Sequence, residues 1–196
     1  MIRRFFLAAL AALVVLPATP RAQVIERAKV SGVYTVECRD AAGNLKWSER
    51  IDNVVTTVGK NLALDTYLTG SGYTATGPFM GLISDSGFTA VAAADTMSSH
   101  AGWVEAGNAN TPTYTSPRPT PSWSSASSGS KGVSSPVSFA ITGTGNIIGA
   151  FVVYGSGAVS TIDNTSGTLY SAGTFGGGAR SVVSGDTVSV TYTASL

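Results

Sequence analysis

The chain has 196 residues and a formal net charge of +1; charged residues make up only 12% of it and hydrophobic residues 43%. This length allows one well-packed domain and excludes two of ordinary size, and the hydrophobic content excludes intrinsic disorder. Three of the 12 basic residues lie within residues 1–22, which leaves nine basic against 11 acidic residues, with no cluster of Lys or Arg. A nucleic-acid-binding role therefore has no electrostatic support.

The first 22 residues have the layout of a secretory signal peptide, because two arginines precede an uncharged apolar run at residues 5–16. This run is too short for a helix that crosses a bilayer, so we expect no stable membrane span. Three interpretations stay open: a signal cleaved near Ala22, an uncleaved hydrophobic arm, or residues added by an upstream start codon. We expect residues 1–22 to lie outside the fold and residues 23–196 to form a single domain.

A β-hairpin is predicted next. Residues 32–38 alternate in polarity with a period of two, which is typical of a strand with one buried face. Residues 40–44 have the composition of a turn, and residues 45–51 resume the alternation. A short apolar run at residues 54–58 follows. The single cysteine, Cys38, lies in the first strand, and we expect it to be a buried small hydrophobic side chain.

One helix is predicted, over about residues 60–68. Leu64, Tyr67 and Leu68 share a face at the spacing of an amphipathic helix. Gly70 follows at a position suited to a C-terminal cap. This is the only helix that the sequence indicates after the N-terminal segment.

An irregular, loop-rich insertion is predicted at residues 87–136, after a strand at residues 78–84. The insertion contains five of the eight prolines and a Ser/Gly tract at residues 124–130. Such a segment holds only short edge strands or surface loops.

The last third of the chain gives the clearest β pattern. Four strands are predicted there, at residues 137–142, 147–154, 168–175 and 186–194. The second is almost continuously apolar, as expected for a central strand covered on both faces. Turn signals recur about every 10 residues, which indicates an all-β fold, a β-sandwich or jelly roll with one short helix.

The segment at residues 95–105 concentrates chemically capable side chains, including the only histidine, His100. Asp95 and His100 with a nearby serine would suit a hydrolase triad, and Asp95, His100 and Glu105 could hold a divalent ion. No nucleophile elbow is present, and the spacing fits no compact metal motif. We favour a local structural interpretation: Asp95 caps a turn, His100 hydrogen-bonds nearby and Trp103 fills the edge of the core. We therefore assign no catalytic, cofactor-binding or metal-binding residue and expect no cofactor.

Five aromatic residues could instead form a platform for sugars: Trp47, Trp103, Trp123, Tyr73 and Tyr114. Scattered aromatic side chains in a β-sandwich more often pack in the core or at its edges. We favour packing over a ligand surface.

Several segments, in this order, resemble a family of small virion proteins of tailed bacteriophages. The resemblance covers about residues 32–194 and rests on residues 32–38, 44–47, 53–61, 95–105, 149–154, 167–173 and 184–187 with the strand that follows.

This resemblance implies a non-enzymatic structural protein of the particle, first a head decoration (cement) protein and second a tail component. It implies contacts with the major capsid protein or other virion proteins, and assembly as a homo-oligomer, often a trimer. It brings no catalytic residues. We expect the insertion at residues 87–136 to provide the contact surface.

Residues 1–22 depart from the resemblance, because a virion protein assembled in the host cytoplasm needs no signal peptide. If they are a true signal, the chain is secreted or periplasmic. The alternative function is then a bacterial β-sandwich adhesin or carbohydrate-binding module.

Overall fold

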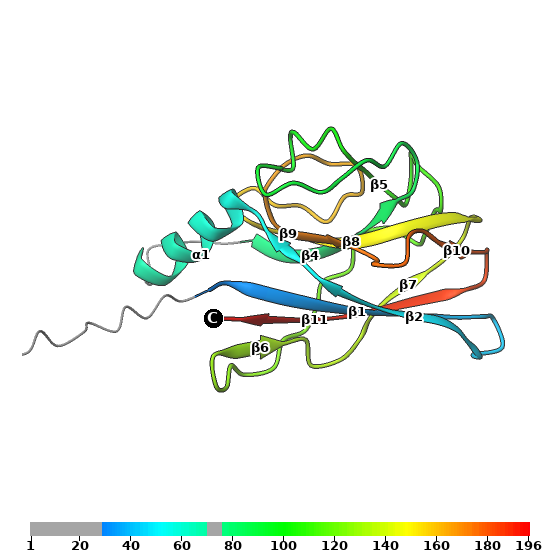
Figure 1. Cartoon of the computed structure of the whole chain (residues 1–196), viewed down its shortest axis with the longest axis horizontal. Helices are drawn as coiled ribbons and strands as arrows, with labels where there is room; N and C mark the ends of the chain where they lie inside the picture. Colours follow the sequence, from blue (N-terminus) through cyan, green and yellow to red (C-terminus); the bar gives the residue numbers. More distant parts are fainter. Residues whose placement is uncertain (1–28, 70–75) are drawn as a thin grey trace, which may run out of the picture.

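The computed structural model of the chain describes residues 29–69 and 76–196, and it is an all-β fold of two antiparallel sheets with one short helix. Figure 1 shows the two sheets as stacked layers with loops above the upper one. The signal-like segment, Gly70 and Tyr73 lie outside the described residues. Within those residues, no helix is both long and apolar enough to cross a membrane.

The lower sheet in Figure 1 has the strand order β2-β1-β11-β6, with β7 also paired to β11. Its strands are β1 (Ser31–Arg39), β2 (Leu45–Asp52), β6 (Ser130–Gly132), β7 (Val137–Ala140) and β11 (Thr187–Ser195). The predicted β1–β2 hairpin is present, and alternate residues of β1 are buried. The first and last strands of the domain pair along their whole length, from Ser31 opposite Ser195 to Arg39 opposite Thr187.

The upper sheet has the order β3-β9-β8-β4-β5, with β10 also paired to β8. Its strands are β3 (Val54–Val55), β4 (Thr76–Ser84), β5 (Val104–Glu105), β8 (Gly145–Gly155), β9 (Thr168–Thr174) and β10 (Arg180–Val182). Seven consecutive residues of β8, 147–153, are buried. This confirms the central strand predicted from its continuous apolar run.

Strand β8 is buried on both faces because each face meets a different hydrophobic cluster. Ala150 and Val152 belong to the core between the two sheets. Phe151 and Val153 point the other way, into a second cluster that contains Trp103 and Met97. The loops above the upper sheet in Figure 1 therefore cover a core of their own.

The helix, α1 (Thr57–Thr69), begins three residues earlier than predicted and shortens the preceding strand to two residues. The reason is Thr56, whose buried hydroxyl accepts the backbone N–H of Gly59 at 2.9 Å and so caps the helix. The same hydroxyl donates to the carbonyl of Leu169 in β9, which fixes the start of α1 against the upper sheet.

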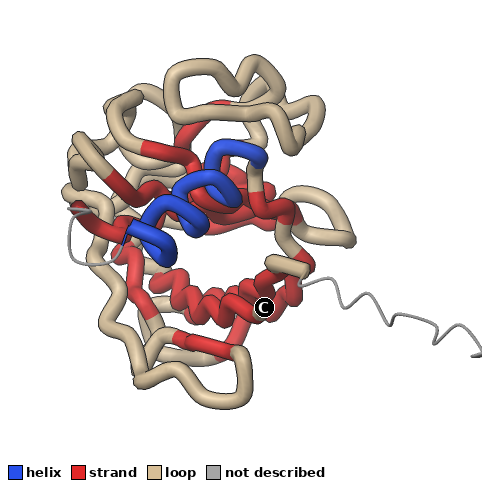
Figure 2. The backbone as a smooth tube through the Cα atoms, turned by 90° about the vertical axis from the view of Figure 1, so that its left-hand side faces the viewer, coloured by secondary structure: helices blue, strands red, loops and turns tan. Residues whose placement is uncertain are grey.

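The apolar face predicted for the helix does not pack on the protein. Leu62 is the large apolar side chain of α1 that is buried, whereas Leu64, Tyr67 and Leu68 are 57%, 81% and 75% exposed. Figure 2 shows α1 lying across one end of the sandwich, where the C-terminus also lies. A short helix that rests on β9 by one side leaves its other side in solvent.

Candidate functional site

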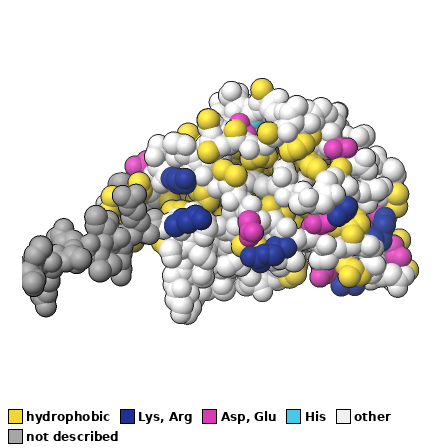
Figure 3. Space-filling view, in the orientation of Figure 1, with side chains coloured by type: hydrophobic (Ala, Val, Ile, Leu, Met, Phe, Trp, Pro, Cys, Tyr) yellow, Lys and Arg dark blue, Asp and Glu magenta, His cyan; other side chains and the backbone are white. Residues whose placement is uncertain are grey.

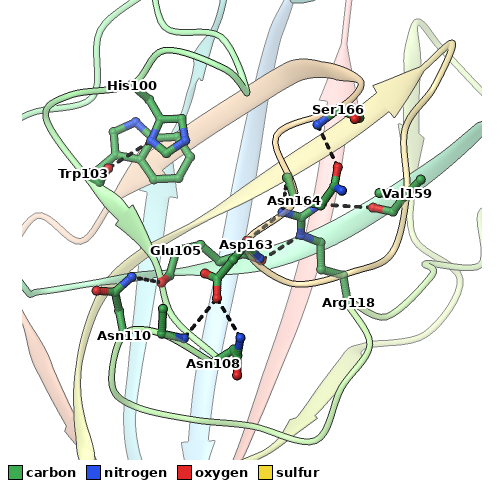
Figure 4. Close-up of polar contacts among 11 residues, drawn as sticks. His100, Trp103, Glu105, Asn108, Asn110, Arg118, Val159, Asp163, Asn164 and Ser166 are labelled. Atoms are coloured by element: carbon green, nitrogen blue, oxygen red, sulfur yellow. Dashed lines mark hydrogen bonds and ion pairs between the residues drawn. The ribbon is translucent and has the colours of Figure 1, made fainter.

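The segment at residues 95–105 lies above the upper sheet, where it faces the loop between β8 and β9 (Figure 4). A hollow of about 140 Å³ opens between them. Its lining includes His100, Trp103, Glu105, Asn110 and Asp163. The hollow therefore contains two of the three residues considered for a metal site.

His100 and Trp103 form a stacked pair, with ring centroids 4.0 Å apart and planes inclined by 23°. The Nδ1 atom of His100 lies 2.9 Å from the carbonyl oxygen of Trp103. Because a carbonyl oxygen only accepts, Nδ1 carries the proton and donates. The Trp103 side chain is buried in the second cluster, against Phe151.

Asp95 is bonded to the tryptophan and not to the histidine. Its Oδ2 accepts the indole N–H of Trp103 at 3.0 Å and the backbone N–H of Ala92 at 2.9 Å. A hydrolase triad needs the carboxylate on the imidazole Nδ1, a position that the Trp103 carbonyl occupies here. This geometry follows the local structural interpretation, in which Asp95 closes a turn and His100 bonds to its own loop.

Glu105 and Arg118 form a buried bidentate ion pair. Nε and Nη2 of Arg118 donate to Oε1 and Oε2 of Glu105 at 2.7 and 2.6 Å. The Arg118 side chain is fully buried and that of Glu105 is 5% exposed. Burial raises the pKa of the Glu105 carboxyl, and the hydrogen bonds and charge of Arg118 oppose that shift.

Arg118 also joins the insertion to the β8–β9 loop, as Figure 4 shows. Its Nη1 donates to the carbonyl of Val159 at 3.1 Å and its Nη2 to the carbonyl of Asn164 at 2.8 Å. Glu105 in turn accepts the backbone N–H of Asp163 at 2.7 Å. One buried guanidinium thus holds the insertion and the β8–β9 loop together, although they are distant in sequence.

Sequence reasoning did not single out Arg118. The available signal was that no other basic residue lies between Lys60 and Lys131. A lone arginine inside a Pro-rich stretch of a weakly charged chain is a candidate for burial with an acidic partner. Its partner could not be named, because the pairing depends on how the loops fold.

Two further polar side chains around the hollow, those of Asp163 and Asn110, also have partners within the chain. Oδ2 of Asp163 accepts the side-chain N–H of Asn108 and the backbone N–H of Ala109 at 3.1 and 3.0 Å. The side-chain amide of Asn110 donates to the carbonyl of Glu105 at 3.1 Å. With a volume below the roughly 300–1,000 Å³ of ordinary ligand pockets, the hollow has the character of a packing gap between braced loops.

The structure does not bring Asp95, His100 and Glu105 together as metal ligands, since each carboxylate is engaged by a different partner. Across residues 29–69 and 76–196, no group of three or more His, Cys, Asp or Glu side chains is arranged to hold a metal ion. Cys38 is buried, as predicted, and burial raises the pKa of its thiol to about 12.

The aromatic side chains do not form a common platform. Trp103 and Tyr114 are buried in different clusters. Trp47 packs on Phe175, which directly follows β9, and Trp123 packs edge-on against Tyr192 in the lower sheet. These contacts agree with the packing interpretation, and Tyr73 lies outside the described residues.

Among the described residues, the most exposed large hydrophobic side chains lie at one end of the sandwich, which we call the α1 end. They are Leu64, Tyr67 and Leu68 on the outer face of α1 and Leu196, which is 73% exposed; the polar Ser/Gly turn at residues 124–130 lies at the same end. Leu196 donates its N–H to the carbonyl of Gly129 in that turn at 2.9 Å. Basic and acidic side chains are interspersed on the face shown in Figure 3, with no single-sign patch.

No protein-family model, curated protein sequence or solved structure matches the chain.

Proposed function

We propose that the chain is a non-enzymatic structural protein of a tailed-bacteriophage particle, a decoration protein that binds the assembled head. The observation that carries this proposal is the exposed apolar face of α1. Three large side chains, each more than half exposed, lie side by side on one helix. Contiguous apolar surface of this kind marks a contact with another protein.

The internal bonding of the hollow supports a structural role. The carboxylates of Asp95 and Glu105, the guanidinium of Arg118 and the Nδ1 of His100 all have partners within the fold. The further bonds of Arg118 and Glu105 to residues of the β8–β9 loop brace the insertion against that loop. A braced insertion keeps the fold rigid, and rigid partners lose less conformational entropy when they bind.

A decoration protein acts through linkage. If it binds the assembled shell and not the free capsid subunits, its binding free energy adds to the stability of the shell. The proposed partner is the major capsid protein, and the proposed form is a symmetric homo-oligomer, such as a trimer. The turn at residues 124–130 belongs to the insertion for which we expected the contact and lies at the α1 end, so it extends the proposed contact surface.

Binding to particles that lack the protein tests this function. Particles would be mixed with the purified chain, separated on a density gradient, and the bound chain quantified. The Tyr67→Ser/Leu68→Ser variant is expected to bind at least tenfold more weakly, because two side chains at the centre of a contact dominate its energy. The matched control is Leu45→Ser, which removes a 52% exposed leucine at the opposite end of the sandwich and should bind normally. Equal binding by both variants would contradict the assignment of this surface.

A secreted β-sandwich adhesin or carbohydrate-binding module is the second candidate. The charge-then-apolar layout of residues 1–22 favours it. Retention of the chain on a glycan array, together with processing near Ala22, would support this candidate over the virion protein.

A further inference from the structure

The exposed large hydrophobic side chains lie at two opposite ends of the sandwich. In the part of the chain that the structure describes there are six of them, and four lie at the α1 end: Leu64, Tyr67, Leu68 and Leu196. The other two are Leu45, which is 52% exposed, and Val183, which is 42% exposed. These two form a second, smaller apolar surface.

The second surface lies where two turns contact each other. Leu45 directly follows the turn at residues 40–44, and Val183 lies in the turn between β10 and β11. A Cβ atom at Gly185 would lie 3.5 Å from the Cβ atom of Ala41, so the two turns lie side by side. Figure 1 shows both turns at the end of the sandwich opposite α1, which we call the turn end.

The α1 end carries an excess of positive charge. Every arginine that the structure describes forms an ion pair, and the described lysines without an ion pair are Lys29, Lys60 and Lys131. Lys29 lies just before β1, Lys60 is in α1, and Lys131 is in β6, which pairs with the last residues of β11. These three cations outnumber the two anions at this end, which are Asp65 and the carboxylate of Leu196.

The turn end carries the opposite charge. Its ion pairs cancel, and Asp40 and Asp85 are acids without an ion-pair partner among the described residues. Asp85 lies at this end because its N–H donates to the carbonyl of Asn146, and the neighbouring Gly145 pairs with Val182. The two ends therefore match in both apolar character and charge, and opposite charges orient surfaces that meet.

We propose that the α1 end of one free chain docks on the turn end of a second copy. The apolar face of α1 would cover Leu45 and Val183, with the three lysines facing the acids of the turn end. Because the two surfaces differ and lie at opposite ends, the contact does not close on itself and repeats along a row. The contact is small, so association is expected to be weak and to depend on concentration.

This association concerns the chain in the absence of particles and does not rest on the proposed function. Both contacts use the α1 end, so a particle and a second copy would compete for it. The turn end, in contrast, serves only the contact between copies. Its loss should therefore abolish association between copies and leave particle binding intact.

Sedimentation velocity of two complementary variants of the full chain tests the contact. Leu45→Ser/Val183→Ser removes the apolar side chains of the turn end only, and Tyr67→Ser/Leu68→Ser removes two from the α1 end only. Each of these four side chains is at least 42% exposed, so the substitutions leave no cavity in the core. Circular dichroism and the urea midpoint verify the fold of each variant.

The parent chain is expected to form species of increasing mass as its concentration is raised. Each variant alone should associate about tenfold or more weakly, because a few apolar side chains dominate a contact. An equal mixture of the two variants should form a dimer and nothing larger. The mixture offers one intact α1 end and one intact turn end for each pair of chains, and the two remaining ends are blocked.

Four results would overturn the contact: a parent that stays monomeric at its highest soluble concentration, association that persists in both variants, association that persists in the turn-end variant alone, or a mixture without a dimer. The third result would mean that two α1 ends meet face to face. Particle binding by the parent is measured separately and is unaffected by any of these results. Failure of the contact is thus distinguishable from failure of the proposed function.

Discussion

Arg118 and Glu105 are joined by two hydrogen bonds of 2.7 and 2.6 Å in the interior of the protein, and the carbonyls of Val159 and Asn164 occupy further guanidinium donors. A buried charge is tolerated only when its hydrogen bonds and its charge are both matched. This ion pair therefore holds the insertion and the β8–β9 loop in position relative to each other.

The first prediction concerns this pair. Arg118→Ala leaves the buried Glu105 carboxylate without a counter-charge, and leaves its Oε1 and two loop carbonyls without the Arg118 donors. We expect this substitution to lower the free energy of unfolding by about 3–5 kcal/mol. Urea denaturation followed by tryptophan fluorescence measures the loss. Arg118→Met combined with Glu105→Leu should be clearly more stable than Arg118→Ala, because no charge is then left unpaired.

The control is Arg50→Ala, which removes an ion pair with Asp52 in which both side chains are largely exposed. We expect little change there, because exposed pairs contribute little. If Arg118→Ala unfolds at the same urea concentration as the parent, the ion pair does not hold the insertion and the β8–β9 loop in position.

The second prediction reverses the usual effect of Gly→Ala in a helix. Alanine ordinarily stabilises a helical position by roughly 0.5–1 kcal/mol relative to glycine. At Gly59, however, a Cβ atom would lie in steric conflict with the backbone carbonyl of Tyr170 in β9. Gly59→Ala should therefore destabilise the protein by about 1–3 kcal/mol, because a backbone carbonyl in a strand cannot move aside as a flexible side chain can.

Thermal unfolding of Gly59→Ala, compared with Gly176→Ala, provides the check. A Cβ atom at Gly176 meets nothing within 4 Å, so that variant should unfold close to the parent. A Gly59→Ala protein that is more stable than the parent would contradict the close packing of α1 on β9.

The third prediction is a pH dependence from Asp186. Burial acts to raise the pKa of this carboxyl, but the Lys46 ammonium at 2.5 Å and the backbone N–H of Val183 at 2.9 Å outweigh it and hold the pKa below its ordinary value. The unfolded chain then binds the proton more tightly, so the stabilisation is present above about pH 4 and is lost as the pH falls through the lower folded-state pKa.

Urea midpoints measured from about pH 6 down to about pH 2 should therefore fall more steeply for the parent than for Asp186→Asn, which has no carboxyl to protonate at that position. If the urea midpoints of the two proteins fall in parallel as the pH is lowered, the ionised Asp186 carboxylate does not stabilise the fold.

The fourth prediction distinguishes a structural role of His100 from a catalytic role. His100→Ala removes the stack on Trp103 and leaves the Trp103 carbonyl without its donor, so we expect a loss of about 1 kcal/mol in the free energy of unfolding. Particle binding should be unchanged, because His100 is not one of the exposed apolar side chains to which we assign binding. Loss of a glycan-degrading activity in this variant would instead support the hydrolase interpretation.

The strands with regular alternation could be predicted from the sequence because burial on one face imposes a period of two. Strands β1 and β11 are of this kind. Strand β8 was predictable for a different reason, because burial on both faces makes it continuously apolar. The start of α1 was missed because Thr56 makes its capping bond and its bond to Leu169 at once, and the second partner is 113 residues away. The exposure of Tyr67 likewise depends on which side of α1 meets β9.

The candidate site was predictable only in part. The local contacts of His100, Trp103 and Asp95 lie within nine residues, so turn chemistry and a lone histidine were enough to suggest them. The bonds of Arg118 with Glu105 and Asn164 form only once the insertion and the β8–β9 loop are in contact above the upper sheet. No local sequence pattern predicts that contact.

Peptide mass spectrometry of gradient-purified phage particles tests the central claim most directly, because it gives the copy number and the true N-terminus together. The decoration role predicts many copies per particle, in fixed proportion to the major capsid protein, beginning near Gln23 or at a later start. Absence from the particles, with a chain processed near Ala22 in the culture medium, would contradict the decoration role and favour a secreted binding protein.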